Sequence, residues 1–145
     1  MKKLILYFFV VFSYVSCDES KTELFNRGVK ELSKNNSIDL NLIDNVVLIP
    51  NEGCGGCITS ATLFFAKNFD KYESNTIIIF TNVKDIKQLK VTLGKEFLER
   101  KNVLVDTEEF FVDSKISSIY PQILKLNNSK VVESEIFDIN NFKMM

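Results

Sequence analysis

The feature that most constrains this chain is a pair of cysteines separated by two glycines, Cys54-Gly-Gly-Cys57. The apolar segment before it, residues 46–50, predicts a buried strand, and residues 58–72 predict a helix after it. The pair therefore lies where a strand turns into a helix. Unpaired N–H groups and the positive end of the helix dipole favour an anion there, so a thiol ionises more readily and its thiolate attacks disulfides.

Other uses of the two cysteines fit the sequence less well. The chain has no histidine and no second cysteine pair, whereas zinc needs four protein ligands, or three and a water, so no metal site is expected. A structural disulfide is the alternative, but closing so short a loop contributes only ~2 kcal/mol in the chain-entropy picture. We therefore expect a redox loop that includes Gly53, Gly55 and Gly56, with no cofactor besides the disulfide itself.

The N-terminus has the layout of an export signal, with two lysines before a mostly apolar stretch that ends at residue 16. Tyr14 is too bulky for ordinary cleavage after that residue, and Cys17 follows. Residues 14–17, Tyr-Val-Ser-Cys, resemble a bacterial lipobox, in which the cysteine is lipidated, although Tyr14 replaces the usual aliphatic residue. An uncleaved signal anchor is the alternative. Either arrangement places the domain in the bacterial cell envelope, periplasmic or surface-exposed, and tethered to a membrane.

Length and charge bound the rest of the chain. Of 145 residues, 129 remain after the 16 of the signal, enough for one domain of ordinary size. Removing the two signal lysines from 18 basic residues leaves 16 against 19 acidic ones, which does not favour a nucleic-acid partner. The predicted organisation is a signal peptide over residues 1–16, a lipid-anchored tether with a short helix over 17–44, and a globular domain over 45–145.

Predicted strands and helices alternate along the chain. Strands are predicted at residues 45–50, 76–80, 102–106, 122–126 and 131–137, the last two joined as a hairpin, and a small extra strand at 38–43. Helices are predicted at residues 21–34, 58–72, 85–100 and 138–144, with 107–119 a mixed loop or helix. This alternation and the final hairpin imply a mixed β-sheet flanked by helices.

Together these motifs resemble the thioredoxin superfamily, and their order is most similar to the membrane-tethered TlpA/ResA-like thiol-disulfide oxidoreductases of bacterial envelopes. The resemblance is carried by the cysteine motif after the first core strand, the strand at residues 103–106, and Tyr120-Pro121 followed by the strand at residues 122–126. The strand and helix at residues 76–100 fit the TlpA-like βα insertion. The resemblance implies a thioredoxin-like α/β fold.

The resemblance also implies roles for individual residues. Cys54 would be the attacking thiol, and Cys57 would resolve the mixed disulfide. Pro121 would be cis and would bring the backbone of Tyr120 beside the cysteines, where it would hold an extended substrate segment. The implied partners are protein thiols or disulfides and a membrane electron donor or acceptor.

The chain departs from the family pattern at positions that affect turnover. Gly53 replaces a tryptophan, and Leu48 and Ser60 stand where the family has buried carboxylates. Proton transfer to and from Cys57 therefore lacks an obvious helper, because Glu52 is expected to be exposed and to act only through water. The direction of electron flow does not follow from the sequence.

Two functions fit these observations. The first is disulfide exchange with envelope proteins through the CGGC motif, and reduction is the commoner role that the resemblance implies. The second is a lipoprotein binding module that kept the fold, binds an extended peptide or partner, and retained an inert structural disulfide. The missing carboxylates favour the second function. A peroxiredoxin-like site is not expected, because that family's threonine and arginine pattern is absent.

Overall fold

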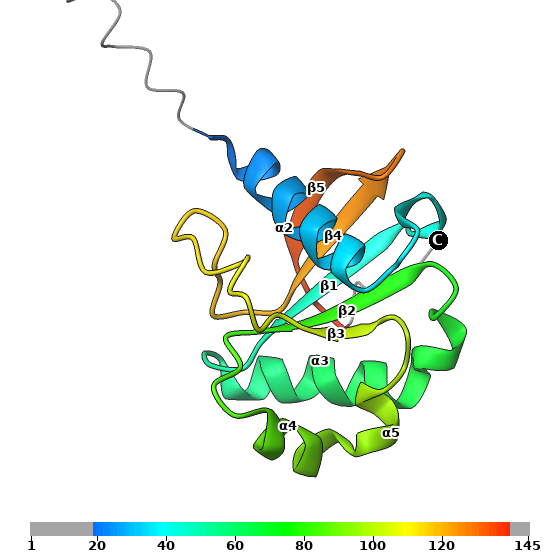
Figure 1. Cartoon of the computed structure of the whole chain (residues 1–145). Coiled ribbons are helices and arrows are strands. Elements are labelled where there is room, and N and C mark those ends of the chain that lie inside the picture. Colours follow the sequence, from blue (N-terminus) through cyan, green and yellow to red (C-terminus); the bar gives the residue numbers. More distant parts are fainter. Residues whose placement is uncertain (1–18, 140–145) are drawn as a thin grey trace, which may run out of the picture.

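The computed structural model describes residues 19–139, which form one five-stranded sheet with the order β3-β2-β1-β4-β5 (Figure 1). The parallel strands are β1 (Asn45–Pro50), β2 (Thr76–Thr81) and β3 (Val103–Val105). An antiparallel hairpin of β4 (Gln122–Asn127) and β5 (Lys130–Ile136) pairs with the other side of β1. The mixed sheet that the sequence predicts is confirmed.

Helices cover both faces of the sheet (Figure 1). One face carries α2 (Lys21–Asn35), and the other carries α3 (Gly55–Asn68), α4 (Ile86–Leu93) and α5 (Lys95–Leu98). Successive strand side chains point to opposite faces, so Val46 and Leu48 of β1 pack on the α2 side, whereas Val47 and Ile49 pack on the α3 side. Burial on both faces explains why residues 46–50 of this strand are all apolar.

Several element boundaries differ from the sequence prediction. The helix expected at residues 85–100 is two helices, because Gly94, at φ +81°, ends α4 and donates its N–H to the carbonyl of Lys90. The strand expected at residues 38–43 is wrong. A 3₁₀ turn, η2 (Leu40–Leu42), forms instead, since the Asp39 carboxylate accepts the N–H of Asn41.

The α2 helix is part of the packed core. Its buried face contacts the sheet through Leu24, Phe25, Val29 and Leu32, each at most 4% exposed. The sequence placed the start of the globular domain at residue 45, whereas the core already includes this helix. The predicted signal peptide, Cys17, and most of the predicted C-terminal helix lie outside the described residues. Within residues 19–139, none of the helices combines the length and apolar character that a bilayer span requires.

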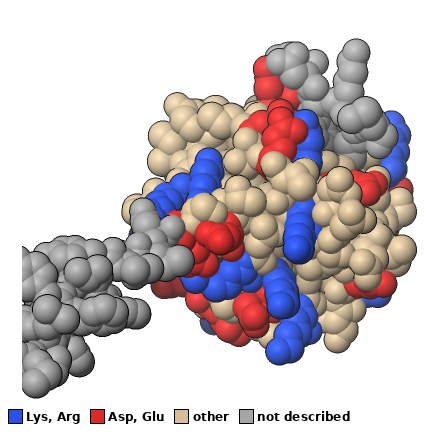
Figure 2. Space-filling view, turned by 90° about the horizontal axis from the view of Figure 1, so that it is seen from above, with Lys and Arg blue, Asp and Glu red and all other residues tan. Residues whose placement is uncertain are grey.

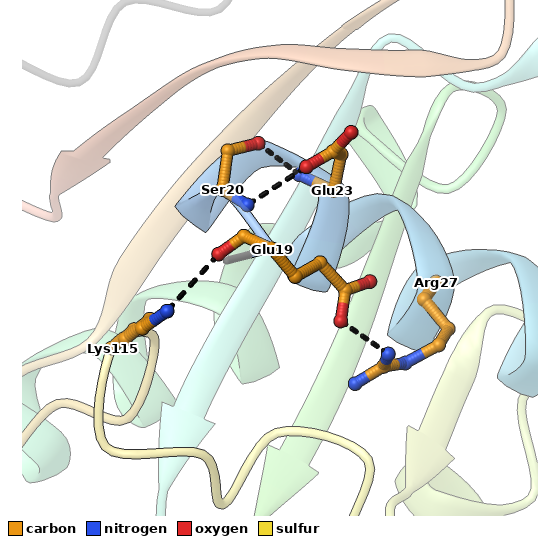
Figure 3. A network of polar contacts seen from close by, with 5 residues as sticks. All are labelled: Glu19, Ser20, Glu23, Arg27 and Lys115. Atoms are coloured by element: carbon orange, nitrogen blue, oxygen red, sulfur yellow. Dashed lines mark hydrogen bonds and ion pairs between the residues drawn. The ribbon is translucent and has the colours of Figure 1, made fainter. Parts of the chain in front are cut away.

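A capping box fixes the start of α2 (Figure 3). The Ser20 hydroxyl accepts the backbone N–H of Glu23, and the Glu23 carboxylate accepts the N–H of Ser20 at 2.7 Å. Both hydrogen bonds to Ser20 lower the pKa of Glu23. The contribution of this carboxylate to stability is therefore present above its ordinary pKa and is lost as the pH falls through the lowered value.

Charges of both signs lie close together on the surface. Figure 2 shows the molecule from the top side of the view in Figure 1, and Lys and Arg side chains lie next to Asp and Glu side chains there. On the hairpin, Lys125 Nζ lies 3.1 Å from Glu133 and 3.2 Å from Glu135, and these hydrogen bonds raise the pKa of Lys125. Such exposed pairs contribute little to stability, about 0–1 kcal/mol each.

An irregular loop, residues 106–121, connects β3 to β4. Asp106 is buried, and its carboxylate oxygens accept the N–H groups of Phe110 and Phe111, both at 3.1 Å. The Phe111 ring packs against Gly28 of α2, where a Cβ would lie only 2.9 Å from the ring. The loop is thus anchored in the core at its start.

Replacing Phe111 by alanine is expected to lower the free energy of unfolding by about 3–5 kcal/mol, because the change leaves a cavity where a buried ring packs. The matched control is Val112→Ala, since this neighbouring side chain is 45% exposed. That change should stay within about 0.5 kcal/mol. Urea denaturation of both variants measures the difference, and equal midpoints would contradict anchoring of the loop by Phe111.

Candidate redox site

The two cysteines lie at the junction of β1 and α3, as the sequence predicts. Cys54 is the N-cap of α3 and forms a disulfide with Cys57, with the two Cα atoms 5.3 Å apart. The N–H of Ile58 donates to the carbonyl of Cys54 at 2.9 Å, so the amides of residues 55–57 precede the first hydrogen bond of the helix. These amides and the helix dipole favour negative charge on the Cys54 sulfur once the disulfide opens.

Both cysteines are half-buried, so their burial does not rank them as attacking and resolving thiols. Gly55 and Gly56 are exposed, and a Cβ at either position would meet nothing within 4 Å. The surface between the two cysteines is therefore open, and no side chain there covers the motif. A macromolecular thiol can approach the motif from that side.

The 106–121 loop touches the motif through the backbone of Ile119. The Cys54 N–H donates to the Ile119 carbonyl at 2.8 Å. Gly53 lies so close that a Cβ would be 2.3 Å from this carbonyl oxygen and 2.7 Å from the Ile119 Cα, and its φ is +143°. Only glycine fits this conformation and this close approach. This glycine thus allows two backbone segments to meet.

Hydrogen bonds on both sides fix the position of Ile119. Before it, the carbonyl of Ile116 accepts the side-chain amide of the buried Gln122 at 3.1 Å. After it, the N–H of Tyr120 donates to the Ser118 hydroxyl at 3.0 Å. Because these bonds hold both ends of the segment, the carbonyl that contacts Cys54 has a defined place.

The same loop is tied to the start of α2 (Figure 3). The Lys115 ammonium donates to the backbone carbonyl of Glu19 at 3.2 Å, and the Glu19 carboxylate pairs with Arg27 at 2.5 Å. These contacts lie on the surface and contribute little to stability. Their consequence is geometric, since the N-terminal end of the described chain lies beside the loop that contacts the cysteines.

The predicted geometry of Tyr120 and Pro121 is wrong. The sequence predicted a cis bond between them, whereas no peptide bond within residues 19–139 is cis. The trans form of an X-Pro bond is favoured by about 0.5–1 kcal/mol, and here Ile119, not Tyr120, makes the backbone contact with the motif. Pro121 is buried, and its carbonyl accepts the N–H of Phe137 at 2.8 Å. A substrate-binding role for Tyr120 and Pro121 stays a prediction.

Within the described part of the chain, no buried carboxylate is free to serve the cysteines. Leu48 is in the apolar core, and Ser60 is exposed. Asp106 is the one buried carboxylate among residues 19–139, but both its oxygens accept loop amides. Glu52 is exposed and pairs with Lys84 at 2.6 Å. Proton transfer at the cysteines therefore relies on water or on the substrate.

Two hollows adjoin the motif. One, of about 170 Å³, lies between α3 and α4 and includes the apolar side chains of Ile58, Leu63 and Leu89. The other, of about 270 Å³, has a wall of mixed polar and apolar surface made by Glu52, Gly53, Asn82, Ser117, Ser118 and Ile119. No local sequence pattern predicted the second hollow, because its wall comes from three separate connections. Among residues 19–139, no group of three or more Cys, Asp or Glu side chains is arranged to hold a metal ion.

The fold and the disulfide define the class of this protein. A CxxC pair at the start of the helix in the β1-α3-β2 unit, within a mixed sheet that ends in a hairpin, is a thioredoxin-like arrangement, and the predicted fold class is confirmed. No family model and no curated protein matches the chain. Among solved structures, a solution structure described as a candidate thioredoxin from Neisseria meningitidis is 11% identical, with 71% of each chain covered and a TM-score of 0.47.

Gly53→Ala is expected to displace the Ile119 segment, because the new Cβ would collide with the Ile119 carbonyl oxygen where it now lies. We expect a loss of about 1–3 kcal/mol in the free energy of unfolding of the oxidised protein and faster reduction of the disulfide by a small thiol.

The matched control for this prediction is Gly56→Ala, three residues away. Gly56 belongs to α3, and a methyl group added there would extend into open space. That change should raise stability by about 0.5–1 kcal/mol. Urea denaturation and the rate of reduction by dithiothreitol measure both effects. A Gly53→Ala protein as stable as Gly56→Ala would overturn the assigned contact.

Proposed function

We propose that this protein is a thiol-disulfide oxidoreductase of the bacterial cell envelope that exchanges disulfides with protein substrates. The observation that carries the proposal is the disulfide across the first turn of α3, which is open to solvent at Gly55 and Gly56. A disulfide that only stapled the fold would not need this exposed position at a helix N-terminus. The helix start, in contrast, stabilises the thiolate that exchange requires.

The reaction needs two transfers between sulfur atoms. In the oxidising direction, a substrate thiolate attacks Sγ of Cys54, the bond to Cys57 breaks, and the electron pair leaves on the Cys57 sulfur. A second substrate thiolate then attacks the substrate sulfur of the mixed disulfide and releases Cys54 as a thiolate. In the reducing direction, the Cys54 thiolate attacks a substrate disulfide, and Cys57 resolves the mixed disulfide.

The surface beside the disulfide offers apolar contact area to such a substrate. Ile119 is 58% exposed and Tyr120 is 39% exposed, although the backbone of Ile119 lies against the cysteine motif. An extended substrate segment that brings its sulfur to Cys54 passes over these two side chains. Tyr120 and Pro121 would then contribute side-chain surface and loop shape to substrate binding.

The envelope location rests on the N-terminal sequence, with Cys17 as the lipidated residue. The α2 helix begins at Lys21, four residues after Cys17, and four residues span at most ~14 Å. A lipid on Cys17 would hold the domain at the bilayer. The N-terminal end of α2, which lies beside the 106–121 loop, would then be close to the membrane. This arrangement favours a membrane protein as the electron donor or acceptor for the couple.

The second candidate is a binding module with an inert disulfide. The observation that favours it is that the one buried carboxylate among residues 19–139, Asp106, is fully used by the loop. A protein of this kind would bind its partner whether or not the two cysteines were present. The two candidates therefore differ in the behaviour of the Cys54–Cys57 couple.

The midpoint potential of the couple separates the two candidates. For an exchange protein we expect a reversible midpoint between roughly −270 and −120 mV, the low end indicating a reductant and the high end an oxidant. A value below about −300 mV, or a couple that is reduced only on unfolding, would support the binding module. Titration in thiol redox buffers, followed by alkylation and mass measurement, gives the value.

A pair of serine variants assigns the roles of the two cysteines. Cys57→Ser should accumulate a mixed disulfide with substrate, because the resolving thiol is missing. Cys54→Ser should not, if Cys54 is the attacking thiol. Non-reducing electrophoresis after trapping with acid shows the adducts. Equal trapping by both variants would contradict the assignment of Cys54 as the attacking thiol.

A further inference from the structure

The wall of the hollow of about 270 Å³ includes the residue directly before Cys54. Gly53 and Ile119 are part of its wall, and they are also the residues whose backbones meet at the cysteine motif. Neighbouring side chains of an extended segment lie about 3.3 Å apart along the chain. A substrate segment that places its sulfur on Cys54 therefore places a nearby side chain at this hollow.

Four side chains of the wall can form hydrogen bonds, and each of them carries an acceptor oxygen. Glu52 offers a carboxylate, Asn82 an amide oxygen, and Ser117 a hydroxyl, whereas the Ser118 hydroxyl already accepts the N–H of Tyr120. The one charged group of the wall, Glu52, is negative. Such a set suits a cationic donor, and a guanidinium can bond a carboxylate through two parallel N–H groups.

The present partner of Glu52 can be exchanged. Lys84 lies 2.6 Å from the carboxylate, but the two side chains are 77% and 57% exposed. An ion pair this exposed contributes little, because water solvates both groups almost as well. A basic side chain of the substrate would thus replace Lys84 at small cost, while an acidic one would be repelled by Glu52.

We propose that this hollow is a specificity subsite, in which Glu52 receives an arginine or lysine side chain that lies next to the reacting cysteine of the protein substrate. The inference rests on the proposed function and names its substrate class, which is proteins with a basic residue beside the exchanged cysteine. Asn82 and Ser117 accept the remaining N–H groups of the bound cation. The neighbouring apolar surface of Ile119 contacts the stem of the same side chain.

The test uses the reduced full-length protein in detergent and short peptides, each with a disulfide to a small thiol. In each set of three peptides, one position holds Arg, Ala or Glu and the rest of the sequence is the same. Four such sets vary, in turn, the two positions before and the two positions after the cysteine. Second-order rate constants of exchange are measured at low and high salt. We expect the Arg peptide to react about two- to fivefold faster than the Glu peptide at one position, with the preference falling at high salt.

Two variants of the ion pair should change this preference in opposite directions. Glu52→Gln removes the negative charge and should abolish the ratio between Arg and Glu peptides. Lys84→Gln removes the competing cation and should increase the ratio. Glu96→Gln is the matched control, since it makes the same change on an exposed residue of α5 and should leave the ratio unchanged.

The outcomes separate this inference from the proposed function. If the Ala peptides react but no position shows a preference for Arg over Glu, the proposed subsite is wrong and the proposed oxidoreductase function stands. The same conclusion follows if the Glu52→Gln variant retains the preference. If no peptide exchanges with the reduced protein, the proposed function fails and the subsite fails with it. An unchanged ratio in Lys84→Gln would also contradict the exchange of partners at Glu52.

Discussion

The hydrogen bond from the Cys54 amide to the Ile119 carbonyl is the contact on which the site depends. It joins the start of α3 to a loop that follows in the chain only after two further strands. Gly53 makes the bond possible, because any side chain there would collide with the Ile119 backbone. The contact sets the place of the disulfide relative to the exposed side chains of Ile119 and Tyr120, and it closes one wall of the hollow that Glu52 lines.

The sheet explains why these segments meet. The three parallel strands β1, β2 and β3 all end at the same edge, so the connections that follow them gather there. Glu52 follows β1, Asn82 follows β2, and the 106–121 loop follows β3. The loop reaches the cysteines because its start is bound by Asp106 and by the packing of Phe111 against Gly28 of α2. A helix far from the cysteines in sequence thus supports the site.

The chemistry of the pair follows from its immediate surroundings. The helix start favours a thiolate at Cys54, whereas within residues 19–139 no carboxylate is placed to move protons for Cys57. Glu52 is the nearest acid in sequence, but it is exposed and paired with Lys84. We therefore assign Glu52 to recognition, as the proposed subsite requires, and not to proton transfer, a distinction that proximity in sequence alone did not make.

The sequence alone determined the α/β class, the core strands and the place of the disulfide at the start of α3, because hydrophobic period, glycine and the CxxC spacing are local signals. It also marked Gly53 as unusual. Only the tertiary structure decided which backbone approaches Gly53, that the Tyr120–Pro121 bond is trans, that α2 belongs to the core, and that Glu52, Asn82 and Ser117 share one hollow. These facts depend on contacts between segments that are distant in sequence, and on which conformation of the whole 106–121 loop has the lowest free energy. No short sequence segment determines either of them.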